Sequence, residues 1–272
     1  MVTTVTSLDN PSVKLARALG KRRDRQRERA FLVEGVRALS EATGAGAIPR
    51  VIFISRELLG DGDEQERLLI TLTEQRADGP GRHMRVLEVT PQVMKAIGET
   101  ETPSGIAGIL PFPESAPPAP GVPLLVIADG VRDPGNLGTM LRTALGAGAT
   151  AFYTTASTVD LYNPKVVRAA MGVHFRLALR SNVGWDLLDR ELAGCAAVWG
   201  ADAGGETLYS AADLTQPTAL IIGNEDRGIS PEGQERCTDL LAIPLAGGLE
   251  SLNAAMAAAV ILFEAARQRR AA

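Results

Sequence analysis

The chain has 272 residues, of which 45% are hydrophobic and 22% charged, and its formal net charge is -4. This length allows two ordinary domains or one large one, with cores built from aliphatic side chains because only 4% of the residues are aromatic. The acidic balance excludes a protein that coats nucleic acid non-specifically, and leaves room for a local basic patch.

The first 110 residues alternate between predicted helices and strands. Asn10-Pro11 is typical of a helix cap followed by proline at the first helical position. The hydrophobic patterns predict strands over 31–35, 50–55, 85–89 and 105–110, and helices over 36–45, 63–76 and 91–97. This alternation predicts a compact α/β domain over residues 1–110.

A run of charged residues, KRRDRQRER, occupies positions 21–29. One interpretation is a solvated helix face, which is what most charge runs are. Basic residues outnumber acidic ones here in an otherwise acidic chain, which favours a segment that contacts phosphate groups just as much. The candidate phosphate contacts are Lys21, Arg22, Arg23 and Arg25.

Residues 111–123 contain six prolines and cannot form a sheet ladder or a helix interior. We therefore expect a stiff, extended linker there, and a domain boundary. The second domain is predicted to span residues 124–272.

The second domain again alternates strands and helices. Strands are predicted over 124–128, 151–155, 175–179, 196–200, 220–222 and 240–245, with helices over 137–145, after Asn163-Pro164, over 185–192 and from the Glu250–Asn253 stretch to about 269. This order predicts a mostly parallel sheet with helices on both faces.

Polar residues stand at three junctions of this domain. Asn136 lies at the entrance of the first helix, with Arg142 six residues on; alone, they are explained as a cap and a solvent-facing side chain. Glu225 directly follows a buried strand, where open α/β sheets place their ligands. The alternative for Glu225 is a turn carboxylate that caps the next helix, although Ser230 suits that role better.

Ser251 and Asn253 open the last, alanine-rich helix. One of them is explained as the N-cap, and the pair is explained less well by capping alone. The chain has no glycine-lysine phosphate loop and no Gly-x-Ser-x-Gly elbow. Cys195 and Cys237 have no zinc-binding spacing with either histidine, so we expect no metal site, and unpatterned cysteines favour the cytoplasm. No apolar stretch reaches the roughly 18 residues of a membrane helix.

Three blocks in this order resemble the three motifs of the SpoU/TrmH family, in the SPOUT class of RNA 2′-O-ribose methyltransferases. They are the NLGxxLRTA block that starts at Asn136, the IGNExxGIS block that starts at Ile222, and IPL at Ile243 followed by ESLN at Glu250. The resemblance covers about 124–269. The first domain resembles, less specifically, the L30e-like substrate-binding domain that often precedes this one.

The resemblance implies a trefoil knot and S-adenosylmethionine bound by Gly223, Ile243 and Leu252. It also implies a homodimer through the second domain and a catalytic set of Asn136, Arg142, Glu225, Ser251 and Asn253. The RNA contacts would be Arg168 together with Lys21, Arg22, Arg23 and Arg25. Ribosomal RNA is the first expectation for the substrate because it is the commonest target in the family, and transfer RNA is the second.

Two questions stay open at this stage. Arg142 is either a base or a phosphate ligand, and because arginine is a poor base at neutral pH, the ligand is favoured. Asp226 stands where the family usually has a small residue, and its charge either weakens RNA approach or tunes the substrate. It is also the single feature that favours the alternative of a catalytically inactive RNA-binding protein.

Overall fold

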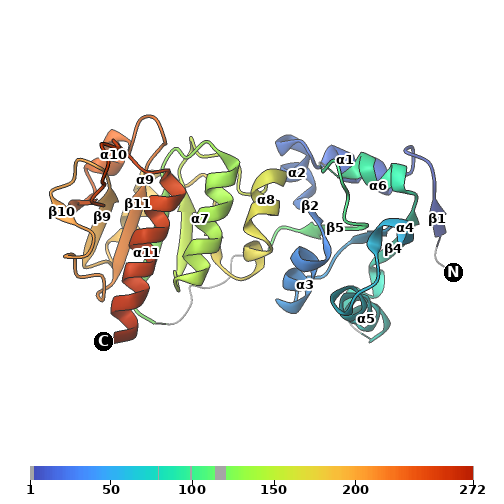
Figure 1. Ribbon diagram of the computed structural model, residues 1–272. Helices are drawn as coiled ribbons and strands as arrows, with labels where there is room; N and C mark the ends of the chain where they lie inside the picture. Colours follow the sequence, from blue (N-terminus) through green and yellow to red (C-terminus); the bar gives the residue numbers. More distant parts are fainter. Residues whose placement is uncertain (1–2, 79, 99, 114–120, 272) are drawn as a thin grey trace. The chain divides into compact units, whose positions relative to one another are not determined.

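The computed structural model describes residues 3–78, 80–98, 100–113 and 121–271. It forms two compact units, Met1–Glu114 with Tyr162–Phe175, and Ser115–Leu161 with Arg176–Ala272. The predicted linker lies mainly at 114–120, outside the described residues. Figure 1 labels the elements of both units.

The first unit is built on a mixed five-stranded sheet. In spatial order its strands are β1 (Thr3–Val5), β4 (Arg85–Val89), β3 (Val51–Ile54), β5 (Ile106–Pro111) and β2 (Ala30–Glu34). β1, β4 and β3 are mutually parallel, whereas β5 runs antiparallel to both β3 and β2. The four strands predicted from the sequence in this domain are therefore present, and β1 was missed.

Helices cover both faces of this sheet. They are α1 (Pro11–Ala18), α2 (Arg22–Glu28), α3 (Val36–Gly44), α4 (Arg56–Leu59), α5 (Asp63–Asp78) and α6 (Pro91–Ile97), with a 3-10 turn η1 (Pro80–His83). Asn10 caps α1 as predicted, because its side chain accepts a hydrogen bond from the backbone N–H of Ser12 at 2.9 Å. Val13 of α1 and Val93 of α6 are buried in one core with Phe53 of β3.

A segment from the middle of the chain completes the first unit. α8 (Pro164–Ala170) and the 3-10 turn η2 (Val173–Phe175) pack against β2 and α3. The ring of Tyr162 stacks on Phe112 with centroids 3.9 Å apart, and Phe175 stacks on Phe31 at 5.7 Å. The strand predicted over 175–179 is present, but its predicted start is wrong: Phe175 is apolar because it packs on Phe31, and the strand begins at Ala178.

The second unit is built on a seven-stranded sheet in which every strand pair is parallel. The spatial order is β10 (Thr207–Leu208), β12 (Asp239–Ala242), β9 (Ala197–Ala201), β11 (Thr218–Ile222), β6 (Leu124–Ala128), β7 (Ala151–Thr154) and β8 (Ala178–Arg180). β12 ends two residues before Pro244, which has no N–H to donate to a ladder and so shortens the predicted strand.

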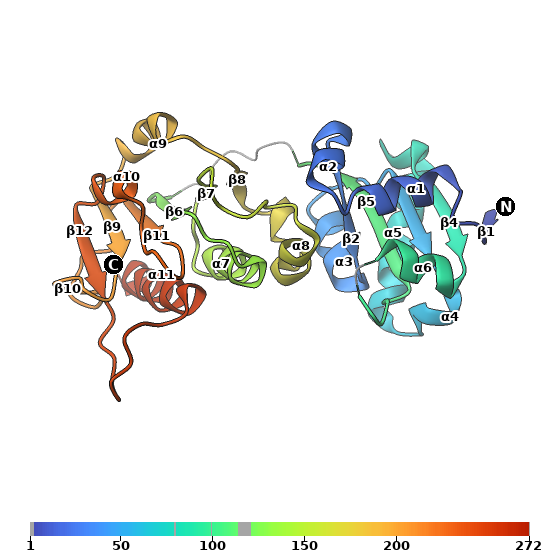
Figure 2. The same cartoon turned by 90° about the horizontal axis from the view of Figure 1, so that it is seen from above.

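Helices lie on both faces of the parallel sheet, as predicted. α7 (Pro134–Gly146) and α11 (Ala254–Ala271) lie side by side on one face, and α9 (Trp185–Leu192) lies on the other, near the short α10 (Pro231–Gln234) (Figure 2). Leu188 of α9 is buried against Ile127 and Ile221. Within the described ranges no helix combines the length and apolarity that crossing a bilayer requires.

Candidate active site

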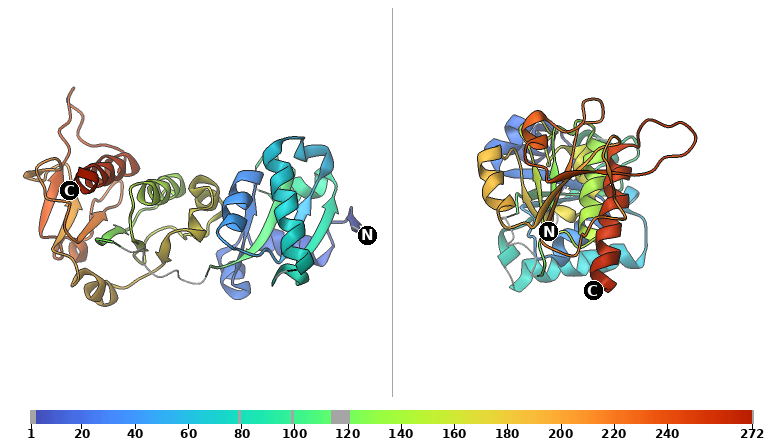
Figure 3. Two further views of the ribbon diagram at one scale, coloured as in Figure 1. Left: turned by 90° about the horizontal axis from the view of Figure 1, so that it is seen from below. Right: turned by 90° about the vertical axis from the view of Figure 1, so that its left-hand side faces the viewer.

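The three sequence blocks lie beyond the carboxyl ends of β6, β11 and β12. The first begins in the opening turn of α7, which follows the loop after β6, the second runs from the last residue of β11 into the next loop, and the third lies between β12 and α11. Because all the strands are parallel, their carboxyl ends meet at one edge of the sheet, where ligands bind in open α/β folds. The loop between β12 and α11 extends away from the rest of its unit (Figure 3), and its residues from Ala246 to Ser251 are exposed. The candidate site therefore lies at this edge of the sheet.

The side chain of Asn136 is available for other contacts because a different residue is the N-cap of its helix. The N-cap of α7 is Asp133, whose Oδ1 accepts a hydrogen bond from the backbone N–H of Asn136 at 2.7 Å. The sequence-based explanation of Asn136 as the cap is therefore wrong. Asp133-Pro134 carries the cap signal instead, with proline at the first helical position.

Asn136 links the other two blocks through its carboxamide. Its Nδ2 donates to Glu225 Oε1 at 2.9 Å, and its Oδ1 accepts from Asn253 Nδ2 at 2.9 Å. Asn253 is itself held at the start of α11, because its Oδ1 accepts a hydrogen bond from the backbone N–H of Ala255 at 3.0 Å. We call Asn253, Asn136 and Glu225 the polar array; its hydrogen bonds run in one direction and end on the carboxylate.

Glu225 is the acceptor at the end of the polar array. Burial raises its pKa, but hydrogen bonds from Asn136 and from the backbone N–H groups of Arg132 and Asp133 outweigh burial, so the net pKa is lowered. Its Oε2 also accepts from Asn224 Nδ2 at 3.2 Å. Glu225 is therefore ionised at neutral pH and is better suited to orient a donor than to hold a proton.

A cavity of about 370 Å³ opens beside the polar array and is lined by the ends of β9, β11 and β12, by the loops that follow them and by α11. Gly223 lines it from the loop after β11, and Ile243 and Leu252 line it from the loop between β12 and α11, as do Ser251 and Leu245. Leu241 of β12 and Ile261 of α11 add apolar surface. Its volume lies within the range of about 300–1,000 Å³ that is usual for small-molecule sites. Gly223 admits no side chain, because the backbone of Gly228 and Ile229 occupies that space.

The charged side chains that line this cavity are all acidic. They are Asp202, Glu225, Asp226 and Glu250, and no lysine or arginine is among the described residues of the lining. Such a surface favours a ligand with a positive charge and opposes a polyphosphate. The absence of a phosphate loop from the sequence agrees with this conclusion.

Arg142 lies apart from the polar array. It is exposed on α7, does not line the cavity, and makes no hydrogen bond or ion pair with any residue that the structure describes. A guanidinium in this state is available to an anion from solution. The structure thus brings together Asn136, Glu225, Ser251 and Asn253, and leaves Arg142 at the surface of the same unit.

The candidate RNA contacts differ in availability. Lys21, Arg22 and Arg23 are exposed at the start of α2, and Arg168 is exposed on α8. Arg25 is only 2% exposed, and its Nη1 donates to the backbone carbonyls of Leu19 and Gly20 at 2.8 Å. The prediction that Arg25 contacts RNA is therefore wrong. Its guanidinium instead donates hydrogen bonds to the carbonyls at the carboxyl end of α1.

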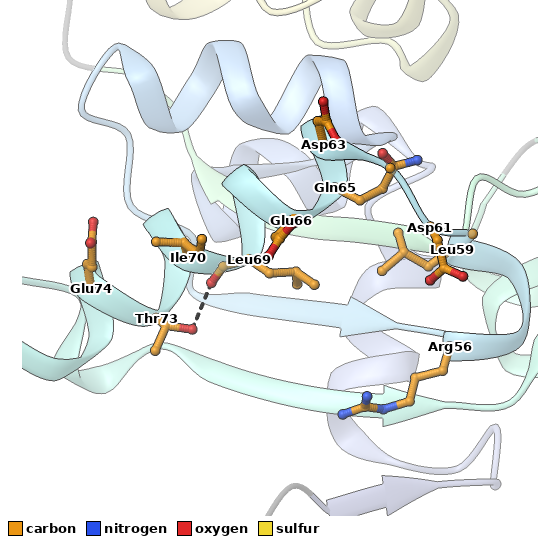
Figure 4. A pocket seen from close by; sticks show the side chains of 12 residues that line it. Arg56, Leu59, Asp61, Asp63, Gln65, Glu66, Leu69, Ile70, Thr73 and Glu74 are labelled. Atoms are coloured by element: carbon orange, nitrogen blue, oxygen red, sulfur yellow. Dashed lines mark hydrogen bonds between the residues drawn. The ribbon is translucent and has the colours of Figure 1, made fainter.

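A second and larger cavity, of about 630 Å³, lies in the first unit (Figure 4). It is lined by α4, α5 and the loop between them, and its charged residues are Arg56, Asp61, Asp63, Glu66 and Glu74. Arg56 also pairs with Glu88 at 3.1 Å. None of the residues of the three sequence blocks lines it, so size alone does not identify the active site.

Sequence reasoning missed three residues that build the site. Asp129 is buried at the end of β6, Asn224 fastens the loop that carries Glu225, and Asp133 caps α7. Asp133 could have been found from the Asp-Pro pair. The signal for Asp129 was its position directly after an apolar strand, the same signal that drew attention to Glu225.

The fold and the site define an α/β enzyme class with a small-molecule cavity at the carboxyl edge of a parallel sheet. Comparison with known families makes this specific. The model of the SpoU rRNA methylase family matches residues 123–263, and that of the MRM3-like substrate binding domain matches residues 10–108. The chain therefore belongs to the SpoU rRNA methylase family.

Individual relatives match over nearly the whole chain. The 23S rRNA (uridine(2479)-2′-O)-methyltransferase of Streptomyces viridochromogenes is 35% identical, covering 92% of this chain and 87% of its own. The 23S rRNA (guanosine(2553)-2′-O)-methyltransferase RlmP of Bacillus subtilis is 32% identical, covering 95% and 97%. The human mitochondrial rRNA methyltransferase 3 is 31% identical, covering 90% and 69%.

Solved structures agree with these sequence relatives. The AdoMet-bound rRNA methyltransferase of Sinorhizobium meliloti has a TM-score of 0.82 at 32% identity and covers 98% of both chains. The SpoU methyltransferase AviRb of Streptomyces viridochromogenes in complex with AdoMet has a TM-score of 0.82 at 31% identity, covering 97% of this chain and 100% of its own. The expected fold and family are confirmed.

Proposed function

We propose that this protein transfers a methyl group from S-adenosylmethionine to the 2′-hydroxyl of a ribose in ribosomal RNA. The observation that carries the proposal is the meeting of the polar array with an acidic, apolar-walled cavity at one edge of the sheet. Membership of the SpoU rRNA methylase family, with relatives named as rRNA 2′-O-methyltransferases, supports the substrate class.

The cavity suits S-adenosylmethionine. That ligand combines a flat adenine and a sulfonium cation, and the cavity combines apolar walls with four carboxylates. Gly223, Ile243 and Leu252 would hold it, largely through backbone groups of loops whose N–H and C=O groups are not used by the sheet. When bound, S-adenosylmethionine supplies an electrophilic methyl group on a good leaving group.

The residues of the chain then have to align the ribose and its hydroxyl proton. Asn136, held between Asn253 and Glu225, has a fixed amide orientation and presents a fixed pattern of donor and acceptor. Ser251 is exposed on the rim of the cavity and offers a hydroxyl that can either donate or accept. These four residues would position the ribose.

Arg142 would bind the phosphate next to the reacting ribose. Its guanidinium is exposed and unpaired among the described residues, and a planar fork of donors matches a phosphate in a bidentate manner. A guanidinium offers N–H donors and no acceptor, so it suits the oxygens of a phosphate and not the hydroxyl proton of the ribose. The phosphate role is therefore the one that we assign.

The first unit would bind the RNA substrate. Its match to an MRM3-like substrate binding domain supports this role, as do the exposed Lys21, Arg22, Arg23 and Arg168. We further infer domains over 1–110 and 124–272, a trefoil knot in the second, a homodimer through it, and a cytoplasmic location. These four inferences rest on family resemblance and on the linker sequence.

The test is methyl transfer with the purified protein, labelled S-adenosylmethionine and ribosomal RNA, followed by mapping of 2′-O-methyl marks. Transfer RNA serves as the alternative substrate. Arg142→Ala should abolish transfer while cofactor affinity, measured by calorimetry, stays within about twofold, because Arg142 does not line the cavity. Full activity of Arg142→Ala would remove it from the scheme.

The main rival is an RNA-binding protein that has lost activity. Asp226 is its support, since this residue adds a carboxylate to the cavity lining. Calorimetry separates the two functions: binding of S-adenosylmethionine supports the enzyme, and RNA binding without cofactor binding supports the rival. Asp226→Gly should raise RNA affinity if the carboxylate opposes RNA approach.

A further inference from the structure

A buried carboxylate without a cationic partner lies beneath the active site. Asp129, at the end of β6, is 3% exposed and forms no ion pair with any described residue. Its Oδ1 accepts from Thr155 Oγ1 at 2.9 Å, and its Oδ2 accepts from the backbone N–H of Ser230 at 2.7 Å. Burying a carboxylate that has no cationic partner is costly even when it accepts hydrogen bonds, so the presence of Asp129 requires an explanation.

The surroundings of Asp129 join the ends of three strands. The backbone N–H of Gly130 donates to the hydroxyls of Thr155 at 3.1 Å and Thr158 at 3.0 Å, which fastens the loop after β6 to the loop after β7. On the other side, Asn224 Nδ2 donates to the carbonyl of Gly130 at 2.9 Å. The loop after β11 is thus attached to the same point.

Glu225 lies at the tip of a closed loop that has two attachments. Reciprocal backbone hydrogen bonds join Asn224 and Gly228 at 2.8 and 2.9 Å, and Asn224 Oδ1 accepts from the N–H groups of Asp226 and Arg227 at 3.1 Å. One end of the loop is fastened at Asn224 and the other at Ser230. Because these hydrogen bonds order the loop internally, its two attachments determine where Glu225 lies.

We propose that Asp129 is a positioning residue for methyl transfer, which holds Glu225 in register with Asn136 through the Ser230 N–H. The inference rests on the proposed function, since Glu225 and Asn136 act there as the array that orients the ribose. We call Asp129, Thr155 and Ser230 the latch.

Replacement by asparagine tests the latch with minimal change of shape. Both partners of Asp129 are donors, and a carboxamide offers one acceptor oxygen and one donor nitrogen. Asp129→Asn therefore gives the Ser230 N–H a neutral and weaker acceptor in place of a carboxylate, and it reverses the contact with Thr155, whose hydroxyl would have to accept from the new Nδ2. We expect kcat at saturating substrates to fall about 10- to 100-fold, since displacement of a positioned group by about 1 Å has costs of that order.

The matched control uses two buried threonines on the same sheet. Thr155 is 5% exposed and directly follows the carboxyl end of β7, whereas Thr150 is 4% exposed, directly precedes β7, and its hydroxyl bonds the backbone of Leu124 at the amino end of β6. Thr155→Val should lower kcat, and Thr150→Val should not. A general loss of stability would affect both variants alike.

Two readouts separate positioning from a merely structural role. In a double-mutant cycle with Glu225→Gln, Asp129→Asn should cost little further activity, because Glu225 no longer has a role to lose. Hydrogen exchange should show the Ser230 amide exchanging about tenfold faster or more in Asp129→Asn. Full additivity in the cycle, or an unchanged Ser230 amide, would overturn the inference.

The wild-type protein forms the reference arm. If it transfers no methyl group to ribosomal RNA, the proposed function fails, and the catalytic part of this inference fails with it. The exchange measurement does not need activity, so it still decides whether Asp129 holds the loop. The failure of one proposal is therefore distinguishable from the failure of the other.

Discussion

Replacing Asn136 by aspartate turns the hydrogen bond between residue 136 and Glu225 into a repulsion, with almost no change in the shape of the side chain. Asn136 Nδ2 donates to Glu225 Oε1 at 2.9 Å, and in Asn136→Asp a second carboxylate oxygen faces Glu225 across that distance. The contact to Asn253 survives, because it uses the Oδ1 of residue 136 as acceptor. The substitution therefore isolates the interaction between position 136 and Glu225.

The magnitude follows from Coulomb's law. Two unit charges about 4 Å apart repel by about 1 kcal/mol in water and about 4 kcal/mol at an effective dielectric constant near 20. Glu225 is exposed, so we expect a repulsion of about 1–2 kcal/mol. This energy corresponds to about a 5- to 30-fold smaller population of the ordered array at neutral pH. Removal of the amide alone, as in Asn136→Ala, carries no such repulsion.

The pH dependence gives the sharpest readout. In the wild type the pKa of Glu225 is lowered, so its hydrogen bonds are complete above the ordinary carboxyl range and are lost as pH falls through the lowered pKa. In Asn136→Asp the paired carboxylates raise one pKa, and taking up a proton restores an O–H···O bond. Activity of the variant relative to wild type should therefore rise as pH falls from 8 towards 5.

The assay is initial-rate methyl transfer over that pH range for wild type, Asn136→Asp and Asn136→Ala. The alanine variant should be impaired to an extent that hardly changes with pH. If both variants show the same relative profile, position 136 does not act through the charge of Glu225, and the predicted repulsion between the two carboxylates is refuted.

The remaining predictions concern the first unit. Arg25→Met should lower the free energy of unfolding by about 1.5–3 kcal/mol in denaturant titrations, because the carbonyls of Leu19 and Gly20 lose a charged donor. Arg23→Met, at an exposed position, should leave unfolding unchanged and reduce the salt slope of RNA binding by about 1; the opposite pattern would contradict both assignments. Tyr162→Ala should cost about 3–5 kcal/mol, as buried aromatic truncations do, and unchanged thermal unfolding would contradict its role in the aromatic cluster.

The sequence alone determined the order and type of most elements. Alternating buried strands and helices predicted two α/β units, because periodicity and proline punctuation are local properties. The three sequence blocks also predicted the family and the edge of the sheet where the site lies. Their residues were identifiable because each directly follows a strand or opens a helix.

Only the tertiary structure decided which side chains meet in the site and which are buried within the fold. Asn136 and Asn253 both looked like caps, and only the structure joined Asn136 to Glu225 and to Asn253. Arg25 is indistinguishable from Arg23 in a charge run, yet one is buried on carbonyls and the other is exposed. The contact between Asn136 and Glu225 joins residues far apart in the chain, which local pattern does not encode. The bonds of Arg25 are local, but which side chain of a charge run turns inward depends on how α2 packs against β2.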